Sequence, residues 1–273
     1  MTKLRNYDGA PNHVREHYRM MRIHQTLTYN RSMRERPLER RLTIRQAMEL
    51  LGQCRDASDP DVDDSNLMHA YQTAERMRAA GEPDWMQFAG LIHDMGKIRM
   101  LFGSDEDGQS LQTQWGISGD TWVVGCRLPD CLVYPEFNEL NPDNCDKDSV
   151  CSQETGIYSA GCGIRNLMFT WGHDEYMYRV LTQKRYEMFA DGQEFPLPQE
   201  ALDCIRLHSA YPWHEGGAYD WAETAYDQVL KSLVKRFNSY DLYSKEDGVC
   251  DIESLKPYYE ELMDKYLPGD ISF

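Results

Sequence analysis

The chain has 273 residues, of which 41% are hydrophobic, and this supplies enough apolar material for a substantial core. Its 45 acidic and 29 basic residues give a net charge of −16, which disfavours nucleic acids and anionic membranes as partners because both reward clustered Lys and Arg. We find neither a run of about 18 apolar residues nor an apolar segment near Met1, so we expect no membrane span and a cytoplasmic location.

The charge is unevenly distributed along the chain. Residues 1–46 hold 11 of the 29 basic residues but 4 of the 45 acidic ones, so the remainder is steeply acidic. The stretch "HYRMMRIHQTL" at 17–27 has the pattern of an amphipathic helix, and the interspersed acidic residues do not fit a transit peptide. We therefore expect 1–46 to form a basic N-terminal helical arm.

Helical periodicity dominates the chain beyond this arm and predicts a mainly α protein. One helix is expected from a cap at Asp64–Ser65 to a stop at Gly81, and the next from an N-cap at Asp84 to an end at Gly96. Further helices are predicted at 163–181, 198–211, 221–241 and 252–267.

Residues 101–162 lack this periodicity. Their Pro, Asn, Asp and Gly content is typical of turns, so we expect a loop-rich cover with a short hairpin at "TWVVGC" (121–126). Loops of such length in a compact chain usually cover a functional site or are inserts. No linker or internal repeat divides the chain, which predicts a single domain over 1–273.

The eight cysteines are scattered without a CxxC pair. This excludes a zinc ribbon and favours reduced thiols over a disulfide framework. We interpret each cysteine as a small buried hydrophobic residue.

Polar residues occur on or at the ends of three predicted helices: His69 on one, His93–Asp94 at the end of the next, and Asp241 at the end of a third. Taken singly, each has an ordinary explanation as a satisfied core histidine, a weak "HD" dipeptide or a turn-forming carboxylate. Taken together, imidazoles and carboxylates form a ligand set suited to a divalent metal. The apolar stripe before Asp241 is expected to comprise Val229, Leu233 and Phe237.

The order H…HD…D resembles the HD-domain superfamily of helical metal-dependent hydrolases. His173 in "WGHDEY" and His208 in "RLHSAY" extend the set to six ligands, enough for two metals if Asp94 bridges them. Imidazole and carboxylate accept Mn, Fe, Co, Ni or Zn, so the ligands leave the metal open. We interpret the other histidines as surface or core residues: His13, His17, His24 and His214.

Longer motifs resemble one family, the di-iron myo-inositol oxygenases. These motifs are "DASDPDVDDSNLMHAYQTAE", "GLIHDMGK", "GDTWVVGC", "WGHDEYMY", "HSAYPWH", "FNSYDLYSK" and "KPYYEELMDKYLPG". The likeness extends from "LRNYDGAP" almost to Phe273. It implies an HD-domain-like helical bundle around a dinuclear metal site.

The resemblance also implies roles for individual residues. One iron would be held by His69, His93, Asp94 and Asp241, and the other by Asp94, His173 and His208. Lys97 and Asp94 are implied to be catalytic, with the Lys97 ammonium favouring a substrate alkoxide. On sequence alone, it is equally plausible that Lys97 is a helix C-terminal lysine that interacts favourably with the macrodipole. Substrate contacts are implied for Arg5, Asp56, Ala57, Ser58, Lys97, Gly119, Asp120, His208 and Ser209, with Lys245 as a fainter candidate.

The activity implied by the family is cleavage of the C1–C6 bond of myo-inositol, with O2 as co-substrate, in a four-electron oxidation to D-glucuronate. The cofactor would be two iron ions in a mixed-valent Fe(II)/Fe(III) state, because zinc cannot carry an electron. The alternative is an HD-type phosphohydrolase acting on a nucleotide or phosphoester. The phosphate-binding site of such an enzyme would need clustered cationic side chains or an amide-rich loop. A third reading is a metal-free helical scaffold. We expect a monomer.

The sequence departs from the family pattern at "GSDEDGQSLQTQWGISGDT" (103–121). This connection is longer and more acidic than is usual in the family, and its polar, turn-forming residues predict a surface insertion at 104–114. We further expect the arm that carries Arg5 to close over the substrate pocket.

Overall fold

The computed structural model describes residues 7, 9–56, 65–243 and 250–273. Four of the residues implied to contact substrate therefore lie outside the described residues: Arg5, Ala57, Ser58 and Lys245. The described chain is mainly helical, which confirms the predicted fold class.

The long helices are α1 (Asn12–His24), α2 (Leu27–Glu35), α3 (Ile44–Leu51), α4 (Asn66–Ala79), α5 (Asp84–Ile92), α7 (His173–Ala190), α8 (Gln199–Leu207), α10 (Ala225–Tyr243) and α11 (Ile252–Tyr266). Two short α-helices, α6 (Pro142–Cys145) and α9 (Tyr211–His214), and five 3-10 helices lie between them: η1 (Met95–Leu101), η2 (Pro135–Leu140), η3 (Val150–Ser152), η4 (Ile164–Asn166) and η5 (Asp220–Ala222). The strands β1 (Arg41–Thr43) and β2 (Asp270–Ser272) pair antiparallel.

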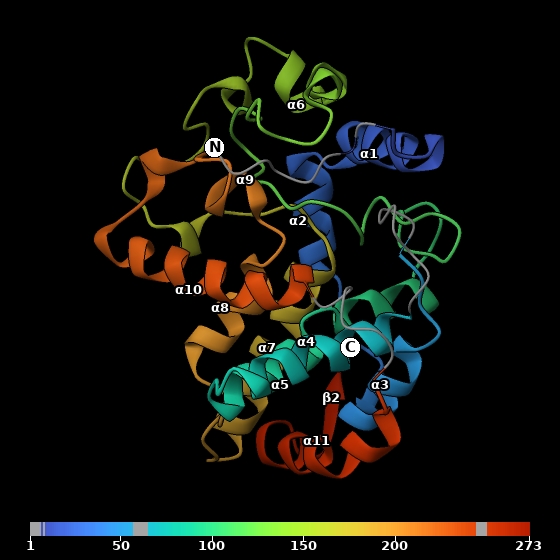
Figure 1. The fold of residues 1–273 in the computed structure, drawn as a ribbon. Coiled ribbons are helices and arrows are strands. Elements are labelled where there is room, and N and C mark those ends of the chain that lie inside the picture. Colours follow the sequence, from blue (N-terminus) through green and yellow to red (C-terminus); the bar gives the residue numbers. More distant parts are fainter. Residues whose placement is uncertain (1–6, 8, 57–64, 244–249) are drawn as a thin grey trace.

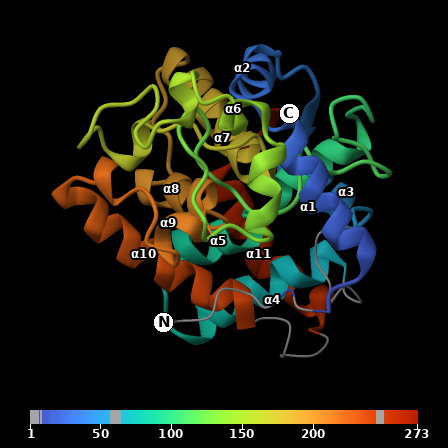
Figure 2. The same cartoon turned by 90° about the horizontal axis from the view of Figure 1, so that it is seen from above.

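Helices α4, α5, α7, α8 and α10 pack against one another at the centre of the molecule (Figures 1 and 2). The closest approach of α4 and α5 depends on Gly90, because a side chain there would lie 2.6 Å from Met77 Sδ. Phe88 and Leu91 of α5 are fully buried, and each contributes roughly 2 kcal/mol of hydrophobic stabilisation. This central bundle supplies the rigid elements on which the functional site is built.

Two ends of the fold flank the bundle. Helix α11 and strand β2 lie at one end and α1 and α6 at the other (Figure 1). Strand β2 pairs with β1, so Leu42 lies opposite Ile271 although the two are far apart in the sequence. Neither the sheet nor the helix α3 that follows β1 was predicted. The pairing of β1 depends on β2, which is distant in the sequence. Helix α3 begins with a capping box between Thr43 and Gln46.

The predicted boundaries of α4 hold where the structure describes them. Ser65 caps the helix, because its hydroxyl accepts a hydrogen bond from Met68 N. Gly81 adopts a φ of +75° just beyond the end of the helix, a conformation that favours glycine.

The prediction for α5 was wrong at both ends. Asp84 is the first helical residue and Pro83 is the N-cap, while the helix ends at Ile92. Gly96 does not end it but lies within η1. The glycine is there for packing, because a Cβ at this position would lie 1.9 Å from the carbonyl oxygen of His173.

The N-terminal arm also differs from the prediction. The expected helix over 17–27 is interrupted between His24 and Leu27, where α1 ends and α2 begins. Thr26 caps α2, and the side chain of Gln25 donates to the carbonyls of Trp115 and Trp171. These bonds to other parts of the chain fix the break.

Two predictions between residues 121 and 181 were wrong for one shared reason. The segment 163–172 is not α-helical and contains only the short 3-10 helix η4, and 121–126 does not form a hairpin. Instead, Val123 and Phe169 form an isolated antiparallel bridge with each other. Helix α7 therefore starts at His173. The prediction of a loop-rich 101–162 holds, since long helices and strands are absent from this described segment.

Helix α10 is rotated relative to the predicted stripe. Val229 is 68% exposed, so its assignment to the apolar stripe was wrong. The buried positions include Leu230, Val234, Phe237, Asn238 and Asp241, so the apolar stripe lies one residue later than predicted at its first two positions. This face turns Asp241 toward the centre of the bundle.

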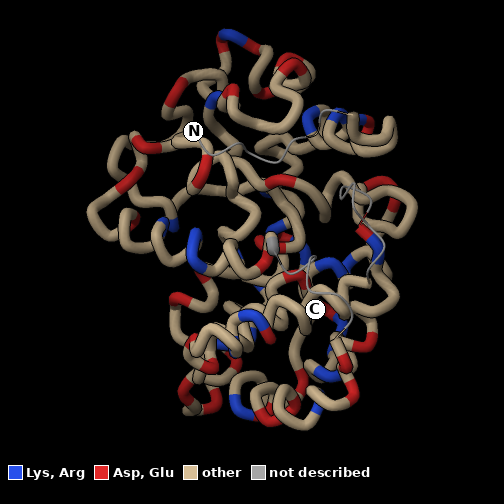
Figure 3. Tube along the Cα trace, in the orientation of Figure 1, with Lys and Arg blue, Asp and Glu red and all other residues tan. Residues whose placement is uncertain are grey.

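Several arginines of the basic N-terminal arm form ion pairs with acidic residues elsewhere in the chain. Arg15 pairs with Glu136, Arg36 with Asp107, Arg41 with Glu187 and Arg45 with Asp264. Figure 3 shows basic and acidic positions interspersed along the trace.

No helix among the described residues is long and apolar enough to cross a membrane. All eight cysteines are free thiols, as predicted. The prediction that each is buried holds for Cys54, Cys126, Cys151 and Cys204, whereas Cys145 is exposed and the other three are partly buried.

Candidate metal centre

The six residues predicted to bind metal meet inside the central bundle. His69 lies on α4, His93 and Asp94 directly follow α5, and His173 is the first residue of α7. His208 directly follows α8, and Asp241 lies in the last turn of α10. Five of the six are buried and His69 is partly buried. Each ligand therefore sits at or near a helix end, from which its side chain can reach a common point.

Backbone carbonyls orient three of the histidines. Nδ1 of His93 lies 2.7 Å from Gly90 O, and Nδ1 of His208 lies 2.8 Å from Ile205 O, in both cases the carbonyl three residues earlier. Nδ1 of His173 lies 2.9 Å from Ile117 O. Because a carbonyl can only accept, Nδ1 carries the proton in each neutral ring, which leaves the Nε2 lone pair facing the centre.

The carboxylate of Asp94 lies between two pairs of histidines. Its Oδ1 is 3.2 Å from His173 Nε2 and 3.8 Å from His208 Nε2. Its Oδ2 is 3.7 Å from His69 Nε2 and 3.6 Å from His93 Nε2. Asp241 Oδ1 completes the second group, at 2.9 Å from His69 Nε2 and 3.5 Å from His93 Nε2.

This geometry fits a pair of metal ions. The Nε2 atoms of His173 and His208 are 3.2 Å apart while both Nδ1 atoms face carbonyls, so in the neutral rings two lone pairs point at one another and a cation between them would satisfy both. Two compact groups of potential ligand atoms share Asp94: His69, His93 and Asp94, and Asp94, His173 and His208. Imidazole and carboxylate ligands of this kind suit divalent transition metals.

The charges at the centre favour cations. Burial raises the pKa of Asp94, but Lys97 and the histidines outweigh it and hold that pKa well below its usual range. Burial lowers the pKa of His93, but Asp94 and Asp241 outweigh burial and raise it to about 9. Without metal, a proton on this imidazole therefore offsets the buried carboxylates.

Lys97 brings an ammonium group from η1 to the edge of this centre. Its Nζ lies 2.9 Å from Asp94 Oδ2 and 2.8 Å from Asp56 Oδ2, and the side chain is 9% exposed. Burial lowers the pKa of Lys97, but the two carboxylates more than reverse this and the group stays charged. The amide oxygen of Asn66 lies 3.5 Å from the same nitrogen. The side chain is thus buried against the centre and does not extend into solvent.

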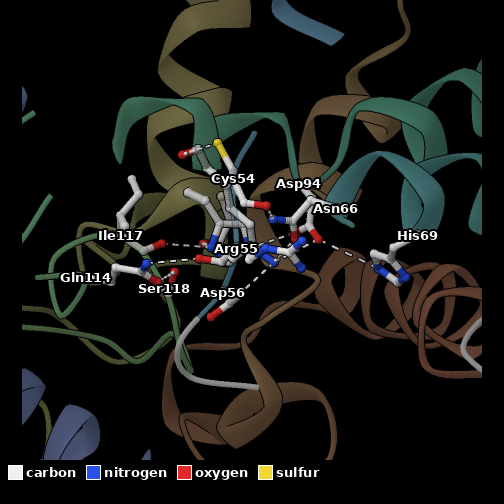
Figure 4. A network of polar contacts seen from close by, with 12 residues as sticks. Cys54, Arg55, Asp56, Asn66, His69, Asp94, Gln114, Ile117 and Ser118 are labelled. Atoms are coloured by element: carbon white, nitrogen blue, oxygen red, sulfur yellow. Dashed lines mark hydrogen bonds and ion pairs between the residues drawn. The ribbon is translucent and has the colours of Figure 1, made fainter. Parts of the chain in front are cut away.

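The described residues implied to contact substrate lie in three segments, of which the first contacts Lys97. Asp56 ends the first, as Figure 4 shows. Gly119 and Asp120 form the second, and Ser209, directly after His208, belongs to the third. The second and third are joined because Thr121 N donates to Ser209 O at 3.0 Å. Gly119 adopts a φ of +98°, which favours glycine at this position.

Sequence reasoning missed the groups that hold these residues in place. They include the carbonyls of Gly90, Ile117 and Ile205 and the side chains of Asn66 and Gln114. One signal was available: a histidine directly after the last residue of a helix can turn back to the carbonyl three residues earlier. His93 and His208 both do so.

Fold and site together define a class: a helical protein whose bundle encloses a His/carboxylate centre able to hold metal ions. A family model described as myo-inositol oxygenase matches residues 11–273. Inositol oxygenases from Homo sapiens and Mus musculus are each 39% identical over 277 residues, covering 99% of this chain and 90% of theirs. That from Dictyostelium discoideum is 36% identical over 276 residues, covering 98% and 89%. The chain belongs to the myo-inositol oxygenase family, which confirms the resemblance seen in its motifs.

Proposed function

We propose that the protein is an inositol oxygenase that opens the ring of myo-inositol with O2 and yields D-glucuronate. One observation carries the proposal beyond family membership. The two oxygens of Asp94 face two separate histidine pairs, which is the arrangement a carboxylate shared by two metal ions requires. The ligand positions coincide with the motifs through which the chain resembles its family.

Two iron ions would be held by the six residues in two groups: His69, His93, Asp94 and Asp241, and Asp94, His173 and His208. When bound, a mixed-valent iron pair supplies the one-electron redox chemistry that lets O2 accept four electrons. The overall reaction balances without an added reductant: C6H12O6 and O2 give C6H10O7 and H2O. Breaking the C1–C6 bond leaves one carbon as an aldehyde and the other as a carboxylic acid.

Lys97 would act on the substrate by charge. Its ammonium lies between Asp56 and Asp94, on the edge of the ligand cluster. A positive charge placed there favours loss of the proton from a substrate hydroxyl and stabilises the alkoxide. Asp56 would in turn hold the ammonium in place and offer its remaining lone pairs to hydroxyl donors.

The polyol itself would be oriented by the three segments that carry the implied substrate contacts. Six hydroxyl groups need many fixed donors and acceptors, and a site with such groups discriminates strongly against molecules that leave them unpaired. Asp56, Gly119, Asp120 and Ser209 would supply part of this set. Arg5, Ala57 and Ser58 remain predictions from the family resemblance.

The phosphohydrolase alternative has less support in the geometry. A phosphate group wants several cationic donors. Among the described residues, the cation that the structure brings to the ligand carboxylates is Lys97, and two carboxylates already share it. We therefore do not advance this as a second function.

Product analysis tests the proposal. Protein loaded anaerobically with iron would be mixed with myo-inositol and then with O2, with glucuronate measured by mass spectrometry and O2 uptake by an electrode. We expect one glucuronate per O2 consumed. A zinc-loaded sample serves as a control and should form none. Two irons per chain with no glucuronate, together with phosphate release from nucleotides, would move the protein to the hydrolases.

A further inference from the structure

Two buried glutamines lie in the acidic segment 103–116, which contains the surface insertion predicted at 104–114. Gln109 and Gln114 are 1% and 5% exposed, although a surface insertion would not need buried amides. A buried amide is stabilising only if its donors and acceptors are paired. The partners of these two side chains therefore indicate what the segment is fastened to.

Gln114 joins two separate parts of the chain. Its Nε2 donates to the carbonyl of Arg55 at 2.9 Å, and its Oε1 accepts from Ser118 Oγ at 3.4 Å. Its own carbonyl accepts from Ile117 N at 2.9 Å and Ser118 N at 3.0 Å. Figure 4 shows the Gln114 side chain beside Ser118, with Arg55 next to them.

Both partners precede residues proposed to contact substrate. Arg55 is followed by Asp56, whose carboxylate binds Lys97, and Ser118 is followed by Gly119 and Asp120. We call 54–56 the first substrate segment and 118–120 the second substrate segment. Gln114 is thus a bridge between the two.

Other contacts hold the outer sides of these segments. Asn66 Nδ2 donates to the carbonyl of Cys54 at 2.8 Å, so the first substrate segment is also tied to α4. His17 Nε2 lies 3.1 Å from Ser118 O and ties the second substrate segment to α1. Between the two segments, Gln114 is the side chain that the described residues place in contact with both.

Gln109 makes a different set of contacts. Its Nε2 donates to Tyr29 OH at 3.1 Å, and its Oε1 accepts from Arg99 Nε at 3.0 Å. These bonds fasten the acidic segment to α2 and η1, and none of them reaches either substrate segment. The same segment thus carries two similar side chains with separable tasks.

We propose that Gln114 is a positioning residue for the polyol, which sets the spacing between the two substrate segments, and that segment 103–116 serves to hold it. This inference rests on the proposed function. If the bridge is removed, each segment must be ordered by the substrate itself, and that ordering reduces the apparent affinity. The chemical step depends on the metal centre and on Lys97, which Asp94 holds independently of the first substrate segment, so it should change little.

The test compares Gln114→Ala with Gln109→Ala in iron-loaded protein. We expect Gln114→Ala to raise the KM for inositol by about 10-fold, because it removes hydrogen bonds to two uncharged groups, the Arg55 carbonyl and the Ser118 hydroxyl. The value of kcat should stay within about threefold of wild type, and both irons should be retained. Gln109→Ala should lower the Tm and leave KM unchanged. Gln114→Glu keeps the acceptor for Ser118 but loses the donor to Arg55, so it should raise KM as well.

A second measurement covers the case in which a variant is poorly folded or inactive. In hydrogen exchange of the iron-loaded proteins without substrate, the amides of the two substrate segments should exchange faster in Gln114→Ala than in Gln109→Ala. Equal KM values for wild type and Gln114→Ala, or equal exchange in the two variants, would overturn the inference alone. A wild-type protein with two irons and no glucuronate would overturn the proposed function, and this inference with it.

Discussion

The two halves of the candidate metal centre are held in place by different means. In the half formed by His173 and His208, the side chains are 5% and 3% exposed and backbone carbonyls orient both rings. In the half formed by His69, His93 and Asp241, His69 is 14% exposed and its Nε2 lies 2.9 Å from Asp241 Oδ1. The first half is oriented chiefly by the backbone, the second also by its own carboxylate.

This difference has a consequence for the metal-free protein. The second half can satisfy itself with protons, because two carboxylates face two imidazoles there. In the first half, the two ring nitrogens lie 3.2 Å apart and share one oxygen of Asp94, so a metal ion satisfies them more fully than a single proton does. Asp94 connects the halves, and changes to it should differ in kind from changes to either half.

Asp94→Asn should produce the largest effect. The amide keeps the size of the side chain but loses the charge shared by both halves, so we expect both metal ions to be lost and activity to fall by more than about 100-fold. Metal content by mass spectrometry and glucuronate formation are the measurements. Retention of one tightly bound iron would contradict a shared Asp94.

Substitutions within one half should remove one metal. We expect His173→Ala to lose the ion of the first half and keep that of the second, whereas His69→Ala should do the reverse, with activity lost in both. Metal counts after gel filtration distinguish the outcomes. Equal loss of both irons in His173→Ala would argue against this partition of the ligands.

A buried ion pair joins the two helices at whose ends the histidines of the first half lie, and it should make the free energy of unfolding depend on pH. Arg206 Nε lies 2.8 Å from Glu175 Oε2, joining α8 to α7 two residues from each histidine ligand. Burial raises the pKa of Glu175, but Arg206 and Arg34 outweigh it and the pKa is lowered. The folded pKa thus lies below the unfolded one, so this stabilisation is present above about pH 4.3 and is lost as the pH falls through the folded pKa.

Glu175→Gln should therefore cost about 3–5 kcal/mol of unfolding free energy at pH 7, because Arg206 remains buried without its partner. The cost should shrink as the pH falls below about 4.3. Urea unfolding at several pH values measures both. Glu136→Gln, in an exposed pair with Arg15, is the control and should cost less than about 1 kcal/mol. A cost for Glu175→Gln that did not fall with pH would contradict the account.

The smallest expected effect is at Asn238. Its Nδ2 donates to the carbonyl of His208 at 2.5 Å, and Nε2 of His214 lies 3.1 Å from the same oxygen. Asn238→Ala should weaken the metal site of the first half by about 10-fold, since groups behind a ligand orient it, and leave the second half unchanged. Calorimetric titration of the metal-free protein would measure both sites. Equal weakening of the two sites would mean that Asn238 acts only on general stability.

Local signals were sufficient to predict much of the fold. The cap at Ser65 and the glycine at Gly81 mark the ends of α4, and the periodicity of 252–267 locates α11. Boundaries failed where a distant partner decides them. Gly96 looked like a helix stop but makes room for the carbonyl of His173, and Val123 pairs with Phe169 across the molecule.

The candidate ligands were predictable because their spacing follows the helices and their motifs resemble a family. Their supporting groups were not. Asn66 and Gln114 are ordinary polar residues in the sequence, and their importance comes from contacts with Cys54 and Arg55, which only the folded chain brings near. The carbonyls that orient the histidines carry no side-chain signal at all.

The most direct test of a shared Asp94 is spectroscopy of the iron pair. Protein loaded with 57Fe and partly oxidised would be studied by Mössbauer and EPR spectroscopy before and after addition of myo-inositol. The account predicts two irons per chain, a signal from a magnetically coupled mixed-valent pair, and a change in that signal with inositol. Two uncoupled irons, or a single iron indifferent to inositol, would contradict it.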